Sequence, residues 1–169
     1  MNATLAAWNK ASPDDALDAM IACCGSRRWA KAMVALRPIA GVAELSEAAD
    51  RLWSTMEEAD WMEAFACHPR IGERKSAHAS ARSAAWSLQE QSDAESAAQR
   101  VLDELAAGNA DYEQRFGFTY IVCATGKSAE EMLTILNRRL ASDRAKELRE
   151  AAEQQRQITQ IRLGKWLIA

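Results

Sequence analysis

One short stretch of the sequence places an imidazole between residues that restrict the backbone. His68 follows an apolar run and is itself followed by Pro69, with Gly72 shortly after. Proline fixes its own φ and disfavours helical backbone at the preceding residue, while glycine permits turns that other residues resist. Because such a side chain is aimed and an imidazole titrates near neutral pH, His68 is the leading candidate for acid/base chemistry. The alternative is a histidine that ends a helix and bonds to the backbone.

A second group of polar side chains follows downstream. Ser87, Glu90 and Gln91 are three and four residues apart, so on a helix they share one face. A hydroxyl, a carboxylate and an amide would then point the same way, as a polar substrate requires. The alternative interpretation is an ordinary solvated helix face.

The C-terminal segment contains a cation in an apolar stripe. Ile158, Arg162 and Trp166 recur every four residues, which is helical spacing. A guanidinium taken out of water needs an anion, and Glu90 or a ligand carboxylate would supply it. Alternatively, the stem of Arg162 packs while its head reaches water.

The elements that position these groups are predicted to be helices, and the fold class is all-α. Apolar residues recur at spacings of three and four, and only three prolines and seven glycines interrupt the chain. At 169 residues with 49% hydrophobic content, residues 1–169 are predicted to form a single compact multi-helix domain. One segment, Phe116 to Cys123, resembles a strand by propensity. Because a lone strand has nothing to pair with, a buried extended segment or an overridden helix start is expected there.

Capping signals and apolar periodicity set the expected helix limits. A stop is expected at Gly108-Asn109, a short turn from Asp111 to Arg115, and a loop from Gly72 to Ser83. The helices are expected from Ser12 to Gly25, Arg27 to Leu36, Ala43 to Glu58, Trp61 to Cys67, Ala84 to Ala107, Ser128 to Leu140 and Ser142 to Lys165.

Composition excludes several classes of protein. The formal charge of -3 and pI near 5.5 argue against a nucleic-acid partner, and no apolar run is long enough to cross a bilayer. No phosphate-binding loop, nucleophile elbow or cofactor motif is present, so no cofactor is expected. The four cysteines do not form a disulfide framework, which favours reduced thiols and a cytoplasmic location. A metal site from Cys67, His68 and His78 lacks a fourth ligand, so no metal is expected.

Four motifs together resemble one family along most of the chain. They are His68-Pro69-Arg70-Ile71-Gly72, Ser87-x-x-Glu90-Gln91, Arg115-Phe116-Gly117-Phe118 and Ile161-Arg162-Leu163. Their order and spacing resemble the 2-oxo-4-hydroxy-4-carboxy-5-ureidoimidazoline (OHCU) decarboxylases, from about Ala16 to Trp166. The resemblance implies an all-helical homodimer that converts OHCU to (S)-allantoin and carbon dioxide, the last step of urate degradation to allantoin.

The resemblance also implies roles for individual residues. His68 and Glu90 match the catalytic pair, and Arg162 matches the substrate-binding arginine. Pro69, Ser87, Gln91 and the backbone after Phe118 match residues that hold the ureido and ring polar atoms. Within that backbone segment, Ile121, Val122 and Cys123 are the further candidates. Thr119 stands where many members have proline, so the loop from Phe118 to Cys123 is expected to be set differently here.

Two other functions remain open from the residues. One is a helical module that binds a protein or small molecule without catalysis; it predicts an exposed apolar groove. The other is a related lyase that acts on a different ureido or imidazole compound. It would keep His68 and Glu90 but change the pocket around the ring.

Overall fold

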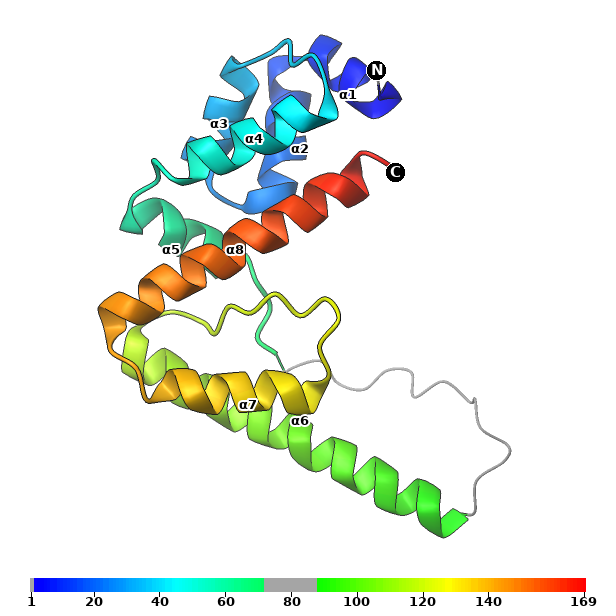
Figure 1. Cartoon of the computed structure of the whole chain (residues 1–169), viewed down its shortest axis with the longest axis vertical. Coiled ribbons are helices and arrows are strands. Elements are labelled where there is room, and N and C mark those ends of the chain that lie inside the picture. The colour runs from blue at the N-terminus through cyan, green and yellow to red at the C-terminus, as the bar shows by residue number, and fades with distance from the viewer. Residues whose placement is uncertain (1, 72–87) are drawn as a thin grey trace. The chain divides into compact units, whose positions relative to one another are not determined.

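A computed structural model describes residues 2–71 and 88–169, and for residues 88–95 it describes the backbone alone. Within these ranges all regular secondary structure is helical, which confirms the predicted fold class. None of the described helices has the length and apolar character needed to span a membrane. The helices, shown in Figure 1, are α1 (Ala3–Lys10), α2 (Pro13–Cys24), α3 (Arg27–Ala35), α4 (Val42–Trp53), α5 (Glu58–Ala66), α6 (Leu88–Phe116), α7 (Ala129–Leu140) and α8 (Arg144–Trp166).

Several helix limits follow directly from the residues at the ends. The side chain of Ser12 accepts a hydrogen bond from the Asp15 N–H at 3.1 Å, and Gly25, with φ of 91°, ends α2. At α7, Ser128 and Glu131 form the predicted capping box through bonds of 3.1 and 2.7 Å. The helix α1 was not predicted, although Asn2 caps it in the same way.

The two helices expected at 43–58 and 61–67 are present, but the expected limit between them is wrong: α4 ends at Trp53 and α5 begins at Glu58. The hydroxyl groups of Ser54 and Thr55 donate to backbone carbonyl groups of the preceding turn at 2.7 and 2.8 Å. Such bonds compete with helix propagation. Glu57 then caps α5 through reciprocal bonds with Asp60, so a new helix begins.

The stop expected at Gly108 is also wrong, and the separate turn expected at 111–115 is part of the same helix. Gly108 lies inside α6, where a Cβ atom would come within 2.8 Å of the Leu136 side chain on α7. Glycine at this position therefore permits the close approach of two helices and does not mark a turn. The helix ends instead at Gly117, whose φ is 83°. Residues 72–87, including the expected loop, lie outside the described residues.

The strand-like segment after α6 contains neither helix nor strand. Five of its side chains are nevertheless almost fully buried, with at most 6% exposed. The expectation of a buried segment without a pairing strand is confirmed, and β-branched and aromatic residues here serve packing. The buried side chains are those of Phe118, Tyr120, Ile121, Val122 and Cys123.

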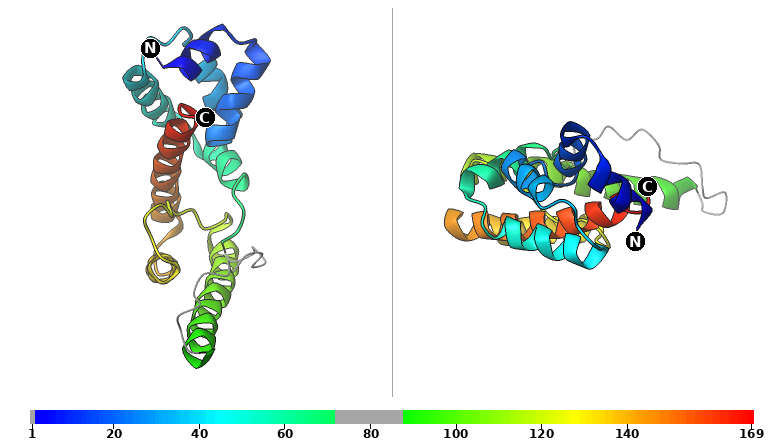
Figure 2. Two further views of the ribbon diagram at one scale, coloured as in Figure 1. Left: turned by 90° about the vertical axis from the view of Figure 1, so that its right-hand side faces the viewer. Right: turned by 90° about the horizontal axis from the view of Figure 1, so that it is seen from above.

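The contacts divide the chain into two compact units. The first contains Met1–His68 and Leu148–Ala169, and the second contains Pro69–Glu147. In the first unit α3 packs against α2, α4 and α5, and Figure 2 shows the two chain ends close together, where the Asn2 side chain donates to the Leu167 carbonyl at 3.0 Å. In the second unit α6 packs along α7. The assignment of residues 1–169 to one domain stays a prediction.

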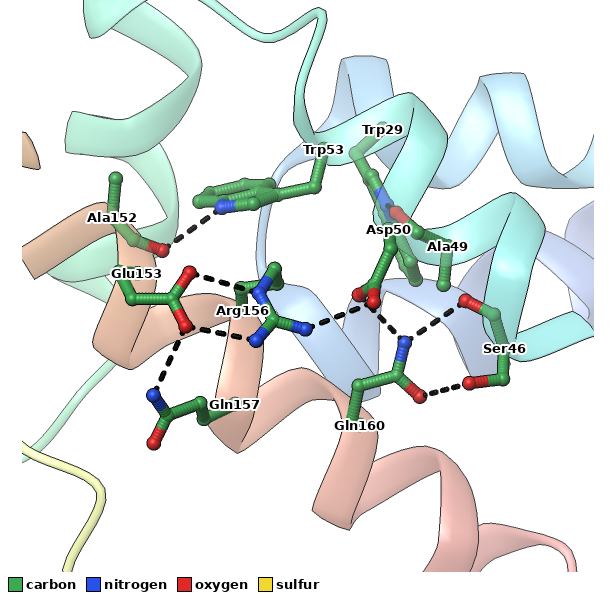
Figure 3. A network of polar contacts seen from close by, with 10 residues as sticks. All are labelled: Trp29, Ser46, Ala49, Asp50, Trp53, Ala152, Glu153, Arg156, Gln157 and Gln160. Atoms are coloured by element: carbon green, nitrogen blue, oxygen red, sulfur yellow. Dashed lines mark hydrogen bonds and ion pairs between the residues drawn. The ribbon is translucent and has the colours of Figure 1, made fainter.

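A polar seam joins α4 to α8 in the first unit (Figure 3). The Gln160 amide nitrogen donates to the Ser46 carbonyl and the Asp50 carboxylate at 2.9 and 2.7 Å, and its oxygen accepts from the Ser46 hydroxyl at 2.8 Å. One helical turn earlier, Arg156 donates to Asp50 at 2.9 Å. Arg156 and Asp50 are partly exposed, so their ion pair contributes little. Gln160 of α8, by contrast, makes three hydrogen bonds to Ser46 and Asp50 of α4.

We therefore predict that Gln160→Ala lowers the free energy of unfolding by about 1–2 kcal/mol, because three partly buried hydrogen bonds are lost. Urea denaturation followed by far-UV circular dichroism measures this change. Gln157→Ala on the same helix removes a single bond to Glu153 and should change stability by less than about 0.5 kcal/mol. Equal effects of the two variants would show that the seam is not stabilising.

Candidate active site

His68 follows the end of α5, and its side chain points to α8 rather than to the backbone. Its N–H continues the helix end by donating to the Phe65 carbonyl at 3.1 Å. Its Nε2 atom lies 2.6 Å from Oε1 of Gln155. The imidazole is thus held by a specific side chain, and the alternative of a merely helix-ending histidine does not account for this contact.

Gln155 determines which ring nitrogen of His68 carries the proton. Its side chain is fully buried, and its amide nitrogen faces the Cys24 carbonyl at 3.4 Å and the Thr159 hydroxyl at 3.1 Å. A carbonyl oxygen accepts only, so the amide nitrogen must face Cys24 and Oε1 must face His68. The neutral imidazole therefore donates from Nε2, which leaves the basic lone pair on Nδ1.

The surroundings of His68 favour its neutral form. Burial lowers the pKa of His68 below the ordinary 6.5, because the imidazolium loses hydration, and the nearby Arg162 charge lowers the pKa further. The hydrogen bond to Gln155 acts in the opposite direction. A neutral, oriented imidazole is suited to accept a proton at neutral pH.

Arg162 is half-buried on α8 in the same unit. In the part of the chain that the structure describes, no carboxylate lies within ion-pair distance of it. Its charge adds to the effect of burial on the pKa of His68 and opposes the effect of burial on the thiol pKa of Cys23 and Cys24. The pairing of this guanidinium with Glu90 or with a ligand carboxylate stays a prediction.

The vicinal cysteines are buried at the end of α2 as protonated thiols. Burial raises the pKa of Cys23 and Cys24 to about 11, and the opposing charge of Arg162 is the smaller effect. Thiolate, not thiol, is the nucleophilic form. These two cysteines are thus packing residues at neutral pH.

The residues that follow His68 are tied to α6 in the second unit. Pro69 is exposed, and Arg70 forms two bonds with Glu113, of 2.7 and 2.8 Å. The Arg70 guanidinium holds the pKa of Glu113 below its usual range. The bidentate geometry links the Arg70 side chain to α6.

The candidate segment from Phe118 to Cys123 also belongs to the second unit. The Phe118 ring packs edge-on against Tyr112 at 5.7 Å, and the Ile121 side chain is 1% exposed. Because these side chains are committed to packing, backbone groups are the part of the segment best suited to hold a polar ligand.

The remaining predicted site residues are only partly placed. Glu90 and Gln91 lie on α6, where the structure describes their backbone alone, and Ser87 lies outside the described residues. Gln155 was missed by sequence reasoning. Its signal was available, because Gln155, Thr159 and Arg162 are four and three residues apart and share a face of α8.

Solved structures place the fold in a known class. The chain superposes on a crystal structure of OHCU decarboxylase in the presence of (S)-allantoin with a TM-score of 0.72 and 32% identity, covering 90% of this chain and 99% of that one. A crystal structure of (S)-allantoin synthase gives a TM-score of 0.69 at 16% identity, covering 96% and 53% of the two chains. At that identity the second likeness shows the fold alone. Both are consistent with the all-helical architecture described above.

The family follows from the sequence itself. The OHCU decarboxylase family model matches residues 9–164, so the chain belongs to the OHCU decarboxylase family. The uric acid degradation bifunctional protein TTL of Arabidopsis thaliana is 37% identical over 144 residues, which is 85% of this chain and 44% of that protein. The 2-oxo-4-hydroxy-4-carboxy-5-ureidoimidazoline decarboxylase of Amia calva is 42% identical over 55 residues, 32% of this chain and 31% of that protein. The matches span less than half the length of both curated relatives.

The environment of His68 predicts opposite effects of its two neighbours on its pKa. Gln155→Leu removes the stabilising acceptor and should lower the pKa of His68 further, whereas Arg162→Gln removes a nearby positive charge and should raise it. Proton NMR of the imidazole during a pH titration measures both shifts. The His78→Asn variant identifies the His68 signal, since the chain has two histidines.

The same pKa shift has a defined sign in stability. Between the lowered folded value and the ordinary 6.5, the unfolded chain binds more protons at His68 than the folded protein. The contribution of His68 to stability is therefore complete above pH 6.5 and declines as the pH falls toward the folded value. In the NMR titration, pKa shifts of the same sign for Gln155→Leu and Arg162→Gln would contradict the assigned environment of His68.

Proposed function

We propose that this protein catalyses the cofactor-independent decarboxylation of OHCU to (S)-allantoin and carbon dioxide. The family match over residues 9–164 supports the substrate, and a solved relative at 32% identity was crystallised in the presence of (S)-allantoin. The observation that carries the catalytic role is the neutral His68 imidazole, oriented by Gln155. The reaction makes this protein a carboxy-lyase.

The substrate contains its own electron sink. Its C4 atom bears a hydroxyl and a carboxylate and lies next to a C5=N bond. When the bond from C4 to the carboxylate breaks, its electron pair forms C4=C5 and the imine pair moves to nitrogen, which takes up a proton. Loss of the 4-hydroxyl proton and addition of a proton at C5 then give the ketone and the new stereocentre. The net change is one proton taken up and one carbon dioxide released.

In this proposal His68 moves the proton. Its Nδ1 lone pair accepts the proton of the 4-hydroxyl group, and delivery to one face of C5 produces a single enantiomer. Gln155 keeps the imidazole in the required tautomer by accepting from Nε2. Glu90 is the proposed polar partner of His68 at the hydroxyl, so the two form the catalytic pair.

The other proposed contacts hold the ring and the ureido group. Arg162, which has no carboxylate partner in the described part of the chain, orients an anionic or carbonyl group of the substrate. Pro69, Ser87 and Gln91 contribute further contacts. The segment from Phe118 to Cys123, including Ile121 and Val122, supplies backbone groups and an apolar wall. A carboxylate held weakly beside apolar groups is easier to expel, because its ground state is not stabilised.

We further propose a homodimer located in the cytoplasm. The family resemblance supports the dimer. The buried protonated thiols of Cys23 and Cys24 are compatible with a reducing compartment. Nucleic acid and membranes are not proposed as partners.

The reaction predicts a large effect of one substitution. His68→Ala should lower turnover by about 100-fold to 10,000-fold, the usual contribution of a general acid/base. The measurement is circular dichroism during conversion of OHCU, generated from urate by the two upstream enzymes. The wild-type protein should give rapid appearance of one allantoin enantiomer.

His78→Ala is the matched control, because it removes the other histidine of the chain, and it should retain turnover. Near-normal turnover of a folded His68→Ala protein would remove the imidazole from the mechanism. Spontaneous decay to racemic product with the wild-type protein would refute the proposed function and favour a binding module or a lyase for another ureido compound.

A further inference from the structure

The irregular segment from Phe118 to Cys123 is fixed by side chains from α6 and α7. Buried backbone groups without helix or strand partners require other partners. The N–H of Tyr120 donates to Oδ1 of Asn109 at 3.1 Å, and the carbonyl of Ile121 accepts from Nη1 of Arg139 at 2.6 Å. Asn109 and Arg139 are 1% and 3% exposed. Two peptide groups of the segment are thus held by buried polar side chains.

The Arg139 guanidinium is itself locked in place. Its Nε donates to Glu147 at 2.8 Å and its Nη2 to the Tyr112 hydroxyl at 3.1 Å, while that hydroxyl donates to Glu147 at 2.6 Å. It also lies 5.0 Å from the centre of the Tyr120 ring. Although burial opposes the charge, Tyr112 and Glu147 outweigh it and raise the pKa of Arg139, so the cation persists. All three nitrogen atoms of the guanidinium are therefore hydrogen-bonded.

Stability alone does not explain a buried ion pair. Replacing such a pair with apolar residues of similar volume is often neutral or stabilising, because desolvation offsets the attraction. The guanidinium does provide geometric precision, since its planar donors point in fixed directions. Of the hydrogen bonds that Arg139 makes within the described residues, the one to the Ile121 carbonyl reaches the irregular segment directly.

The orientation of these two peptides determines which of their groups face away from Arg139 and Asn109. In a trans peptide the C=O and N–H groups point in opposite directions. Fixing the Ile121 carbonyl therefore directs the Val122 N–H away from Arg139, and fixing the Tyr120 N–H directs the Thr119 carbonyl away from Asn109. Among the described residues, neither the Val122 N–H nor the Thr119 carbonyl has an intramolecular hydrogen-bond partner.

We propose that Arg139 is a positioning residue for substrate binding: through the Ile121 carbonyl it holds the Val122 N–H ready for a ureido group, beside the Thr119 carbonyl that Asn109 directs. A ureido group offers a carbonyl acceptor and N–H donors, which complement this donor and acceptor. The inference rests on the proposed function, because the segment's contact with substrate is part of that proposal. Arg139 touches no reacting atom and acts through the backbone.

The test compares variants that separate position from stability. Arg139→Lys keeps the charge but cannot reach Glu147, Tyr112 and Ile121 with a planar fork. Arg139→Met combined with Glu147→Leu replaces the ion pair with apolar groups and should remain folded. Leu136→Ala is the control, because it truncates a fully buried residue of α7 without touching the Ile121 carbonyl.

Two readouts are measured at a temperature where each variant is folded. In the decarboxylation assay both Arg139 variants should raise KM about tenfold or more, with a smaller change in kcat, as expected when a charged hydrogen bond supporting ground-state binding is lost. In both Arg139 variants without substrate, amide hydrogen exchange of residues 118–123 should be faster than in the wild-type protein. Leu136→Ala should leave KM within about twofold and should not single out this segment in exchange.

The outcomes separate the inference from the proposed function. A KM within about twofold of wild type in both Arg139 variants would overturn the inference while the decarboxylase activity stands. If the wild-type protein lacks that activity, the proposed function fails, and the positioning role in substrate binding fails with it. The exchange measurement would then report only whether Arg139 holds the segment. Unchanged exchange at residues 118–123 in the Arg139 variants would show that Arg139 does not hold this segment, whether or not the wild-type protein is active.

Discussion

The first unit depends on one fully buried amide. Gln155 has to satisfy an oxygen acceptor and a nitrogen donor in an interior with few polar groups, and it does so with His68, Thr159 and Cys24. These partners lie on α8, at the end of α2 and just after α5, so one side chain links three parts of the chain. Because an unsatisfied buried amide is costly, this requirement fixes the approach of the elements and the direction of the imidazole at once. The position of the histidine is thus a consequence of packing as much as of the proline that follows it.

In the second unit, too, buried polar groups need hydrogen-bond partners, and here a charged pair provides them. Arg139, Glu147 and Tyr112 form a buried hydrogen-bonded network, which extends to the backbone of Ile121. The first unit therefore orients a neutral base with a neutral amide, and the second orients backbone groups with an ion pair. In both cases a buried polar side chain sets the direction of a group that its own local sequence leaves free.

Local signals in the sequence were sufficient where a helix end depends on its own residues. The caps at Ser12 and Ser128 and the stiffened His68 could be predicted for this reason. The errors arose where distant residues decide: Gly108 resembles a stop signal until Leu136 is placed against it. Gln155 resembles an ordinary helical glutamine because His68 and Cys24 are remote in sequence. Its spacing from Thr159 and Arg162 indicates a shared helix face but not that this face is buried.

The contact between Gly108 and Leu136 links the substitutions that the two positions can accept. Since the two helices lie so close, a Cβ atom at position 108 requires the Leu136 side chain to shift or position 136 to become smaller. A smaller residue at 136 alone leaves a cavity. The effects of substitutions at the two positions on stability are therefore coupled rather than additive.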